Sequence, residues 1–559
     1  MKKQIFLLAI LLGFAFGGFA QPGGGSGAST TYDFGTAING LWQYNSSSDV
    51  YYIVGLFYCA SPADESYEQM GIFVPGAYMD ATANGDGTYT CTVNTTTTVN
   101  GYTSSTAPIV FPVNTSGYSA QSAPSGYSST VATYTAKGFI YLWAGCRGRD
   151  HGAPLGVTDM KAAIRYFRYL KAEQQAVPGN VDRIFTFGHS GGGAQSSLLG
   201  VSGNSSLYDD YMTAIGALTG YDDNVCGSMC WCPITNLDQG DAAYEWNMGL
   251  TRSNLGSADQ NISQGLAAEF AEYVNAVGFK HPDSGETLTL SATSNGYYQS
   301  GSYYEYVMEV INDAVTRYNT YNSASVGTYS TTDETALYSF ASQYKTATKG
   351  LGAFDDYDQK GQAENTLFGI AGTAGHFDKY LASLVQQYAS SYYSDFTADL
   401  AESNVDAVGK TVEERLMMYS PLYYLIDNDT YYNGGGSDIS TVAKYWRIRT
   451  GITQGDAPLN TEINLALALQ NHSDVVSVDF ETIWNQGHTE AEDSGSASSN
   501  FISWVESCTE GTGVGEHTLE SPIRDGIIYT LDGRSLGTTL PDNFRGVYIQ
   551  NGKKHVKVD

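Results

Sequence analysis

A serine stands among glycines in the segment RIFTFGHSGGGAQSSLLG, residues 183–200. The apolar run RIFTF predicts a strand and GAQSSLLG predicts a helix, so Ser190 falls on the turn between them. A hydroxyl on such a turn is exposed above a parallel sheet, and the glycines let strand and helix come close to it. This context indicates a nucleophile, whereas the short motif alone is weak in a chain with 63 glycines. The alternative is a glycine-rich loop that leads into a helix.

A serine nucleophile needs a histidine that takes its proton and an acid that orients this histidine. His488 lies in IWNQGHTEAE, after the predicted strand VVSVDFETIW and before the last predicted helix, where an α/β hydrolase places its histidine. The loop ITQGDAPL, which follows the predicted strand YWRIRTG, contains one acid, Asp456, and we assign it as the triad acid. Glu462 lies further along the chain and is a weaker candidate. His189 belongs to the turn itself and is expected to point away from the site.

The tetrahedral intermediate of acyl transfer needs two backbone N–H donors for its oxyanion. One is expected from Gly191, which follows the nucleophile. The other is expected from the loop after the predicted strand APIVFPV, at Gly117, because glycine lets the backbone come close to a substrate.

The elements that position these residues alternate between strands and helices from about residue 107 onward. APIVFPV, GFIYLWAG and RIFTFG predict strands, and residues 158–175 predict a helix with Thr158 as its N-cap. Such alternation predicts an α/β-hydrolase fold, a mainly parallel sheet flanked by helices, with a large and mostly helical insertion. The predicted parts are a signal peptide at 1–20, the core with an N-terminal β extension at 21–237, the lid at 238–424, the rest of the core at 425–510, and a small β tail module at 511–559.

Composition excludes several classes of function. The 559 residues carry 28 Lys and Arg against 58 Asp and Glu, a formal charge of -30, which disfavours nucleic acid as a partner. No segment after the N-terminus approaches the roughly 20 apolar residues of a membrane span. The seven cysteines lack the spacing of a metal site, so we expect buried thiols or a local disulfide, no metal and no cofactor.

Both ends of the chain suggest export. Two lysines, the apolar run QIFLLAILLGFAFGGFA and small residues up to Ala20 predict a signal peptide, hence a secreted or cell-surface protein, with the periplasm as a further compartment. The last fifty residues, with the turns at 532–533 and 551–552, resemble C-terminal tails that guide proteins across bacterial outer membranes. The outer-membrane secretion machinery is therefore a candidate partner. A small structural module without a sorting role is the alternative.

Between about residues 107 and 508 the chain resembles bacterial tannases and feruloyl-esterase-like α/β hydrolases. The resemblance rests on PVNTSGY, AGCRGRD, GHSGGGAQSSLLGVSGNS, CPITNLDQGDAAYEWNMG, WRIRTG and GH, which occur in this order. It implies that a lysine and a glutamate of the lid, here Lys349 and Glu364, contact the hydroxyls of a galloyl ring. It also implies two aspartates in the acid loop, where this chain has Gln454 and Asp456. With Asp456 in the triad, we expect the second ring contact to be lost.

Together these residues predict a secreted serine carboxylesterase that hydrolyses feruloyl- or galloyl-type esters through an acyl-enzyme. The expected substrate is a small aromatic ester or an ester-decorated plant polymer. A lipase or peptidase of the same fold is one alternative, although the predicted lid is rich in Tyr, Ser, Thr and Asp. A noncatalytic surface protein that binds glycans or polyphenols is another.

Overall fold

The computed structural model describes residues 31–345 and 348–509, together with short strand segments between residues 528 and 557. The chain divides into two compact units, Met1–Thr509 and Glu510–Asp559. The predicted signal peptide, residues 1–20, lies outside the described residues and stays a prediction.

A nine-stranded sheet forms the centre of the first unit, in the order β1-β2-β3-β9-β8-β10-β11-β12-β13. The six strands from β9 to β13 in this order pair in parallel, whereas β1, β2 and β3 add to the β9 edge as antiparallel strands. The sheet strands are β1 (Gln43–Asn45), β2 (Val50–Phe57), β3 (Gln69–Pro75), β8 (Ile109–Val113), β9 (Ile140–Ala144), β10 (Ile184–His189), β11 (Gly227–Trp231), β12 (Tyr445–Gly451) and β13 (Ser477–Ile483). Two short hairpins, β4 (Met79–Ala83) with β5 (Tyr89–Val93) and β6 (Thr98–Val99) with β7 (Tyr102–Thr103), lie outside this sheet.

The central strands are apolar on both faces because both faces are covered. In β10, Ile184 packs into the cluster on one side of the sheet, and its neighbour Phe185 packs into the cluster on the other side. Successive side chains of a strand point to opposite faces, so a strand covered on both sides reads as a continuous apolar run. This is why RIFTF could be identified as a central strand from the sequence.

Helices cover the sheet and supply the crossover connections of the parallel strands. Those that belong to the core are α1 (Ala132–Thr135), α2 (Leu155–Tyr169), α3 (Gly191–Val201), α4 (Asp209–Ala214), α13 (Leu459–Gln470) and α14 (Ala497–Thr509). The predicted N-cap of α2 is wrong: the helix begins three residues before Thr158, whose hydroxyl donates to the Pro154 carbonyl at 3.2 Å. The cis peptide Ala153-Pro154 immediately precedes the helix.

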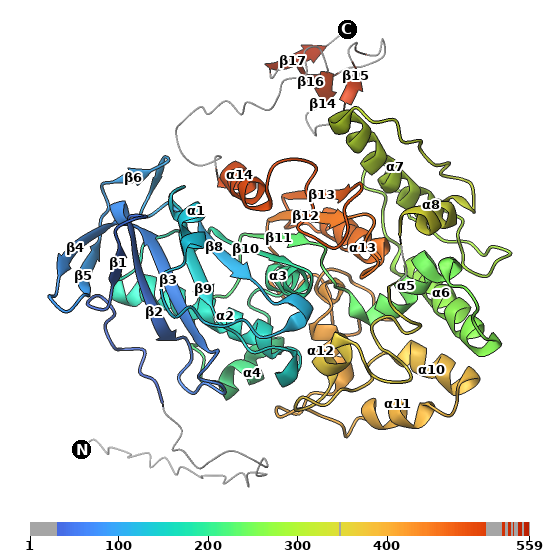
Figure 1. Ribbon diagram of the computed structural model, residues 1–559, viewed down its shortest axis with the longest axis horizontal. Coiled ribbons are helices and arrows are strands. Elements are labelled where there is room, and N and C mark those ends of the chain that lie inside the picture. The colour runs from blue at the N-terminus through green and yellow to red at the C-terminus, as the bar shows by residue number, and fades with distance from the viewer. Residues whose placement is uncertain are drawn as a thin grey trace, which may run out of the picture. The chain divides into compact units, whose positions relative to one another are not determined.

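The predicted lid, residues 238–424, falls between β11 and β12, and this insertion is mostly helical, as expected. Its helices are α5 (Gly240–Met248), α6 (Ser257–Val277), α7 (Ser302–Asn322), α8 (Ala336–Tyr344), α9 (Ala363–Phe368), α10 (Lys379–Tyr388), α11 (Tyr393–Asp399) and α12 (Val412–Met418). In Figure 1 these helices, green to orange, lie at one end of the unit, and the blue strands β1 to β5 lie at the other.

All seven cysteines, which lie in the described part of the chain, are free thiols, five buried and two half-buried. Of the two predicted alternatives, the structure therefore shows thiols and not a local disulfide. Among the described residues, no helix is both long and apolar enough to cross a membrane. In the second unit, β14 (Ile528–Thr530), β15 (Ser535–Gly537), β16 (Gly546–Gln550) and β17 (Lys553–Lys557) form an antiparallel sheet in the order β15-β14-β16-β17. The predicted sorting role of this tail stays a prediction.

Candidate active site

Ser190 lies on a strained turn between β10 and α3. Its φ of 60° and ψ of -125° fall in a region that residues other than glycine rarely adopt. A Cβ on Gly188 would lie 2.4 Å from the Gly192 carbonyl oxygen, and a Cβ on Gly192 would lie 2.1 Å from that of Val113. Glycine is therefore required at both positions. The turn places the serine at the end of a central strand, 7% exposed.

His488 follows β13 and reaches this serine directly. Its Nε2 lies 2.7 Å from the Ser190 hydroxyl oxygen, although 298 residues separate them in sequence. Burial lowers the pKa of the imidazole from its ordinary value. The ring is therefore neutral at neutral pH and can accept the serine proton.

The opposite nitrogen of the ring meets an amide instead of the expected carboxylate. His488 Nδ1 lies 2.6 Å from Gln454 Oε1, in the loop after β12. No hydrogen bond among the described residues joins Asp456 to His488, so the assignment of Asp456 as the hydrogen-bonded triad acid is corrected. Asp456 remains close enough for its charge to raise the pKa of His488.

Gln454 was not predicted to be a functional residue, because an amide carries no charge and does not fit the expected triad. Glu462, the weaker candidate, lies in the first turn of α13 and accepts a hydrogen bond from Gln454 Nε2 at 2.9 Å. One sequence signal could have indicated their role: Gln454 is an amide in the acid loop, and an acid, Glu462, follows it eight residues later.

Gly117 and Gly191 are adjacent in the structure, as an oxyanion hole requires. A Cβ on Gly191 would lie 3.1 Å from the Gly117 backbone nitrogen and 2.5 Å from that of Tyr118. Gly117 has a φ of 56°, and its carbonyl accepts a hydrogen bond from Arg149 Nη1 at 2.7 Å, which holds the loop. The N–H of Gly191 opens α3, where the first amides of a helix have no intrahelical partner. Both backbone donors thus lie beside Ser190.

The lid residues Lys349 and Glu364 form a pair, with Lys349 Nζ 3.7 Å from Glu364 Oε2. The ammonium also lies 4.2 Å from the centre of the Phe354 ring. Glu364 is 2% exposed, and among the described residues its Oε2 has no hydrogen-bond partner. A buried acceptor of this kind is suited to a ligand hydroxyl.

This pair lies near the catalytic side chains. The charge of Lys349 lowers the pKa of His488, and the charge of Glu364 contributes to the raised pKa of Tyr118, next to Gly117. Tyr244 connects the lid to the acid loop: its hydroxyl accepts from the Lys349 N–H at 3.4 Å and donates to the Gly455 carbonyl at 2.8 Å. The predicted substrate residues Lys349 and Glu364 are therefore close enough to the predicted catalytic residues to affect their pKa values.

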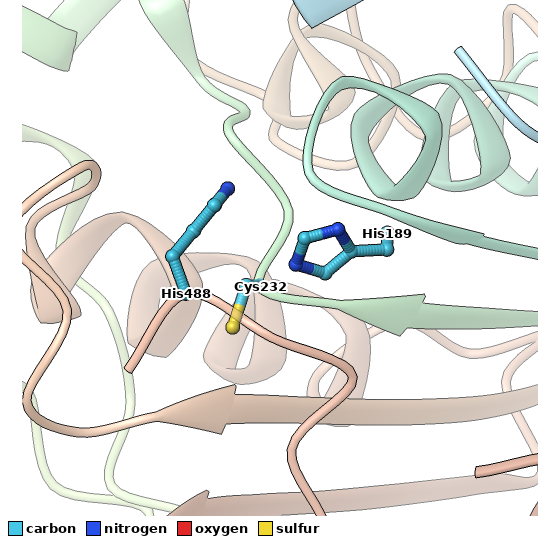
Figure 2. Close-up of side chains that lie close together, drawn as sticks. All are labelled: His189, Cys232 and His488. Carbon is cyan, nitrogen blue, oxygen red and sulfur yellow. The ribbon is translucent and has the colours of Figure 1, made fainter. Parts of the chain in front are cut away.

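His189 does not point away from the site, contrary to expectation. Its ring centroid lies 4.7 Å from that of His488, and burial lowers its pKa to about 4. Figure 2 shows His189, Cys232 and His488 close together. One potential ligand atom from each of the three lies within 4.8 Å of the others. However, both nitrogens of His488 are bonded, and the Cys232 thiol, whose pKa burial raises to about 12, donates to the Thr489 carbonyl at 3.2 Å. This donor set serves the serine site, so we assign no resident metal to it.

A separate cavity of about 140 Å³ lies within the lid. Its walls include Asp238, Tyr380, Leu416 and Tyr431. Neither Ser190 nor His488 lines it, so it is distinct from the candidate active site.

Comparison with known proteins agrees with this geometry. A family model described as BD-FAE matches residues 98–276. Among solved structures, a tannin acyl hydrolase in complex with ethyl gallate is similar at a TM-score of 0.64 and 28% identity, over 82% of this chain and 94% of that chain. Tannase from Lactobacillus plantarum is similar at a TM-score of 0.64 and 27% identity, over 82% of this chain and 95% of that chain. Fusobacterium nucleatum tannase is similar at a TM-score of 0.62 and 28% identity, over 82% of this chain and 95% of that chain. No curated protein sequence matches the chain.

These similarities confirm the predicted α/β-hydrolase fold and the predicted resemblance to bacterial tannases. They also confirm the predicted class of enzyme: the chain is a carboxylic ester hydrolase.

Proposed function

We propose that this chain hydrolyses esters of phenolic acids by a serine mechanism. The observation that carries the proposal is the distance of 2.7 Å between the Ser190 hydroxyl oxygen and His488 Nε2, with the serine on a strained turn. A strained serine bonded to a neutral histidine is suited to nucleophilic attack on an acyl carbon.

The steps follow from the positions of the atoms. Ser190 Oγ attacks the ester carbonyl carbon while His488 Nε2 takes the hydroxyl proton. The N–H groups of Gly191 and Gly117 stabilise the oxyanion that forms. His488 then gives the proton to the leaving alcohol, and an acyl-enzyme remains. Water repeats the sequence, with His488 as base, and releases the acid and the free serine.

The lid supports a hydroxylated aromatic acyl group. Lys349 offers N–H donors and Glu364 offers a buried acceptor, a combination that suits the hydroxyls of a flat ring. Because Gln454 occupies the place beside His488, Asp456 is available as a further contact, which removes the reason to doubt a galloyl-type ring. Structures of the related tannin acyl hydrolase contain ethyl gallate and 3,4-dihydroxybenzoate.

The test compares hydrolysis of methyl gallate, methyl ferulate, methyl 3,4,5-trimethoxybenzoate and a long-chain p-nitrophenyl ester. We expect methyl gallate to be hydrolysed with a higher kcat/KM than its trimethoxy analogue, because methylation removes the hydroxyl donors. Ser190→Ala should lower kcat by about 10⁶-fold, or to the detection limit. Preference for the long-chain ester would favour a lipase, and equal turnover by Ser190→Ala would contradict the serine mechanism.

A further inference from the structure

The amide of Gln454 holds the histidine but carries no charge. In a serine hydrolase, the group bonded to the far nitrogen of the histidine fixes its tautomer and stabilises the imidazolium that forms during attack. A neutral carbonyl oxygen can fix the tautomer, but it stabilises the imidazolium only weakly. Stabilising the imidazolium needs a negative charge close to the amide.

A buried carboxylate lies behind this amide. Glu462 is 0% exposed, and its Oε1 accepts hydrogen bonds from Gln454 Nε2 at 2.9 Å and from the Thr450 hydroxyl at 2.7 Å. The remaining hydrogen of the Gln454 amide points to Thr450 Oγ1 at 2.6 Å. Both protons of the amide are thus engaged on the side away from His488.

This arrangement determines which atom donates in each hydrogen bond from Glu462 through Gln454 and His488 to Ser190. Glu462 Oε1 only accepts, so the NH₂ group of Gln454 must face it and the carbonyl must face His488. His488 Nδ1 must then carry a hydrogen. The lone pair of Nε2 is left for the proton of Ser190, which is the tautomer that catalysis requires.

Lys345 provides a cation for this carboxylate. Burial raises the pKa of Glu462 to about 8 and lowers that of Lys345 to about 8, and the attraction between the two groups opposes both shifts. Glu462 therefore carries its charge above about pH 8. Among the described residues, neither Lys345 Nζ nor Glu462 Oε2 has a hydrogen-bond partner. The hydrogen bonds to Glu462 thus come from Gln454 and Thr450, both at Oε1.

We propose that Glu462, acting through the side-chain amide of Gln454, performs the role of the triad carboxylate for His488. Gln454 and Glu462 are positioning residues, and the proposal rests on the serine mechanism proposed above. It assigns Asp456 to the substrate side of the site.

The first test separates turnover from binding. Gln454→Met leaves Nδ1–H without an acceptor, and we expect kcat for methyl gallate to fall about 10²- to 10⁴-fold while KM changes little. Glu462→Gln keeps the shape and an acceptor oxygen but removes the charge, and at pH 9, where Glu462 is ionised, we expect kcat to fall about tenfold. Unchanged kcat in Glu462→Gln would overturn the proposal.

The second test exchanges the two groups. Gln454→Glu combined with Glu462→Gln reverses the amide and the carboxylate, with Thr450 able to donate in either arrangement. We expect the exchange to restore kcat at least to the wild-type value, a rescue that a purely structural role would not give. Asp456→Asn is the matched control and should change KM more than kcat. A larger loss of kcat in Asp456→Asn than in Gln454→Met would instead identify Asp456 as the triad acid.

A spectroscopic measurement distinguishes failure of this proposal from failure of the serine mechanism. In protein with ¹⁵N-labelled histidine, the Nδ1–H proton of His488 should resonate at low field in the wild type and in Ser190→Ala, and should shift in Glu462→Gln. A fluorophosphonate probe reports separately whether Ser190 reacts. A reactive serine with no shift in Glu462→Gln would overturn the relay alone, whereas an unreactive serine would overturn the mechanism. Thermal melts identify any variant that is unfolded.

Discussion

The imidazole of His488 is influenced by two charges of opposite sign. Asp456 raises its pKa and Lys349 lowers it, while burial, the largest effect, lowers it. Because His488 acts as a base in its neutral form, kcat/KM should rise with pH as the ring loses its proton. The lowered pKa places this rise below the ordinary value of 6.5. Ionisation of Glu462, whose pKa burial raises to about 8, should raise kcat again, by the factor that Glu462→Gln removes.

Substitution of Lys349 or Asp456 should move the acid limb of the plot of kcat/KM against pH in a known direction. Lys349→Met removes a positive charge, so the pKa of His488 and the midpoint of the limb should rise, by about half a pH unit. Asp456→Asn should move the midpoint to lower pH. Lys379→Met, in an exposed lid pair with Glu413, is the control and should leave the midpoint in place. Measuring kcat/KM against pH gives the three midpoints, and movement of the first two in the same direction would contradict this electrostatic account.

The sequence predicted the residues that chemistry constrains most. Ser190 and His488 could be located because a strained turn and a strand-end histidine leave recognisable patterns, and the structure brings them together. Gln454 could not be assigned, because the loop that contains it also contains an aspartate, and only the fold decides which of the two reaches Nδ1. Glu462 reaches the amide because α13 begins directly after this loop, a distance that sequence separation does not give.

At the scale of elements, a buried arginine joins three segments of the core. Arg147, in the loop after β9, binds Asp159 of α2 through Nη2 at 2.6 Å and through its backbone N–H at 2.8 Å. Its Nη2 also lies 3.7 Å from Glu68, immediately before β3. The two carboxylates are 0% exposed and the arginine 4%. The N-terminal β extension is thus tied electrostatically to the parallel core, which was not expected from the sequence.

Loss of this arginine should destabilise the protein strongly. Arg147→Met leaves the carboxyl groups of Asp159 and Glu68 buried without a cation, which should lower the free energy of unfolding by about 3–5 kcal/mol. The matched control, Lys410→Met, removes only a partly exposed ion pair with Glu414 at the start of α12 and should cost about 0.5 kcal/mol or less. Denaturant unfolding measures both values.

The loss of free energy of unfolding in Arg147→Met, called the deficit below, should depend on pH. Burial and the charge of Asp159 already raise the pKa of Glu68 to about 7, and removal of the arginine raises it further. A carboxyl whose pKa is higher in the folded than in the unfolded state is destabilising when it must be ionised. The deficit should therefore be larger at pH 8 than at pH 5. A deficit that grows as the pH falls would show that the carboxylates are compensated by other groups.

The pattern of elements was more predictable than their ends or their pairing. Alternating strands and helices gave the parallel sheet, because a strand buried on both faces must be apolar throughout. The N-cap of α2 could not be placed, since Thr158 fits a cap by residue type, whereas the turn at Ala153-Pro154 starts the helix earlier. The addition of β1, β2 and β3 to the main sheet depends on pairing between distant segments, which local patterns do not contain.

At the scale of the whole molecule, the lid and the core belong to one compact unit. The unit Met1–Thr509 contains both segments of the hydrolase core and the lid between them. Tyr303 of α7 shows how the lid is attached to the core: its hydroxyl donates to Asn464 Oδ1 of α13 at 2.6 Å. Within the lid, Arg252 binds Glu245 of α5 at 2.5 Å and donates to the carbonyls of Lys349 and Gly350 at 3.0 and 2.7 Å. The loop that carries Lys349 is thereby fixed to the helix that follows the core.

The unit Glu510–Asp559 contributes none of the catalytic or lid residues identified above. Every such residue lies before Thr509, and a compact unit can in general fold without a neighbour joined to it by a linker. A chain that ends at Thr509 should therefore keep the kcat/KM of the full-length protein for methyl gallate within about twofold, with the same midpoint of thermal unfolding. Parallel assays and melts of the two chains check this expectation. A tenfold loss of kcat/KM with unchanged melting would mean that the tail contributes to substrate binding, whereas a lowered melting temperature would mean that it stabilises the hydrolase unit.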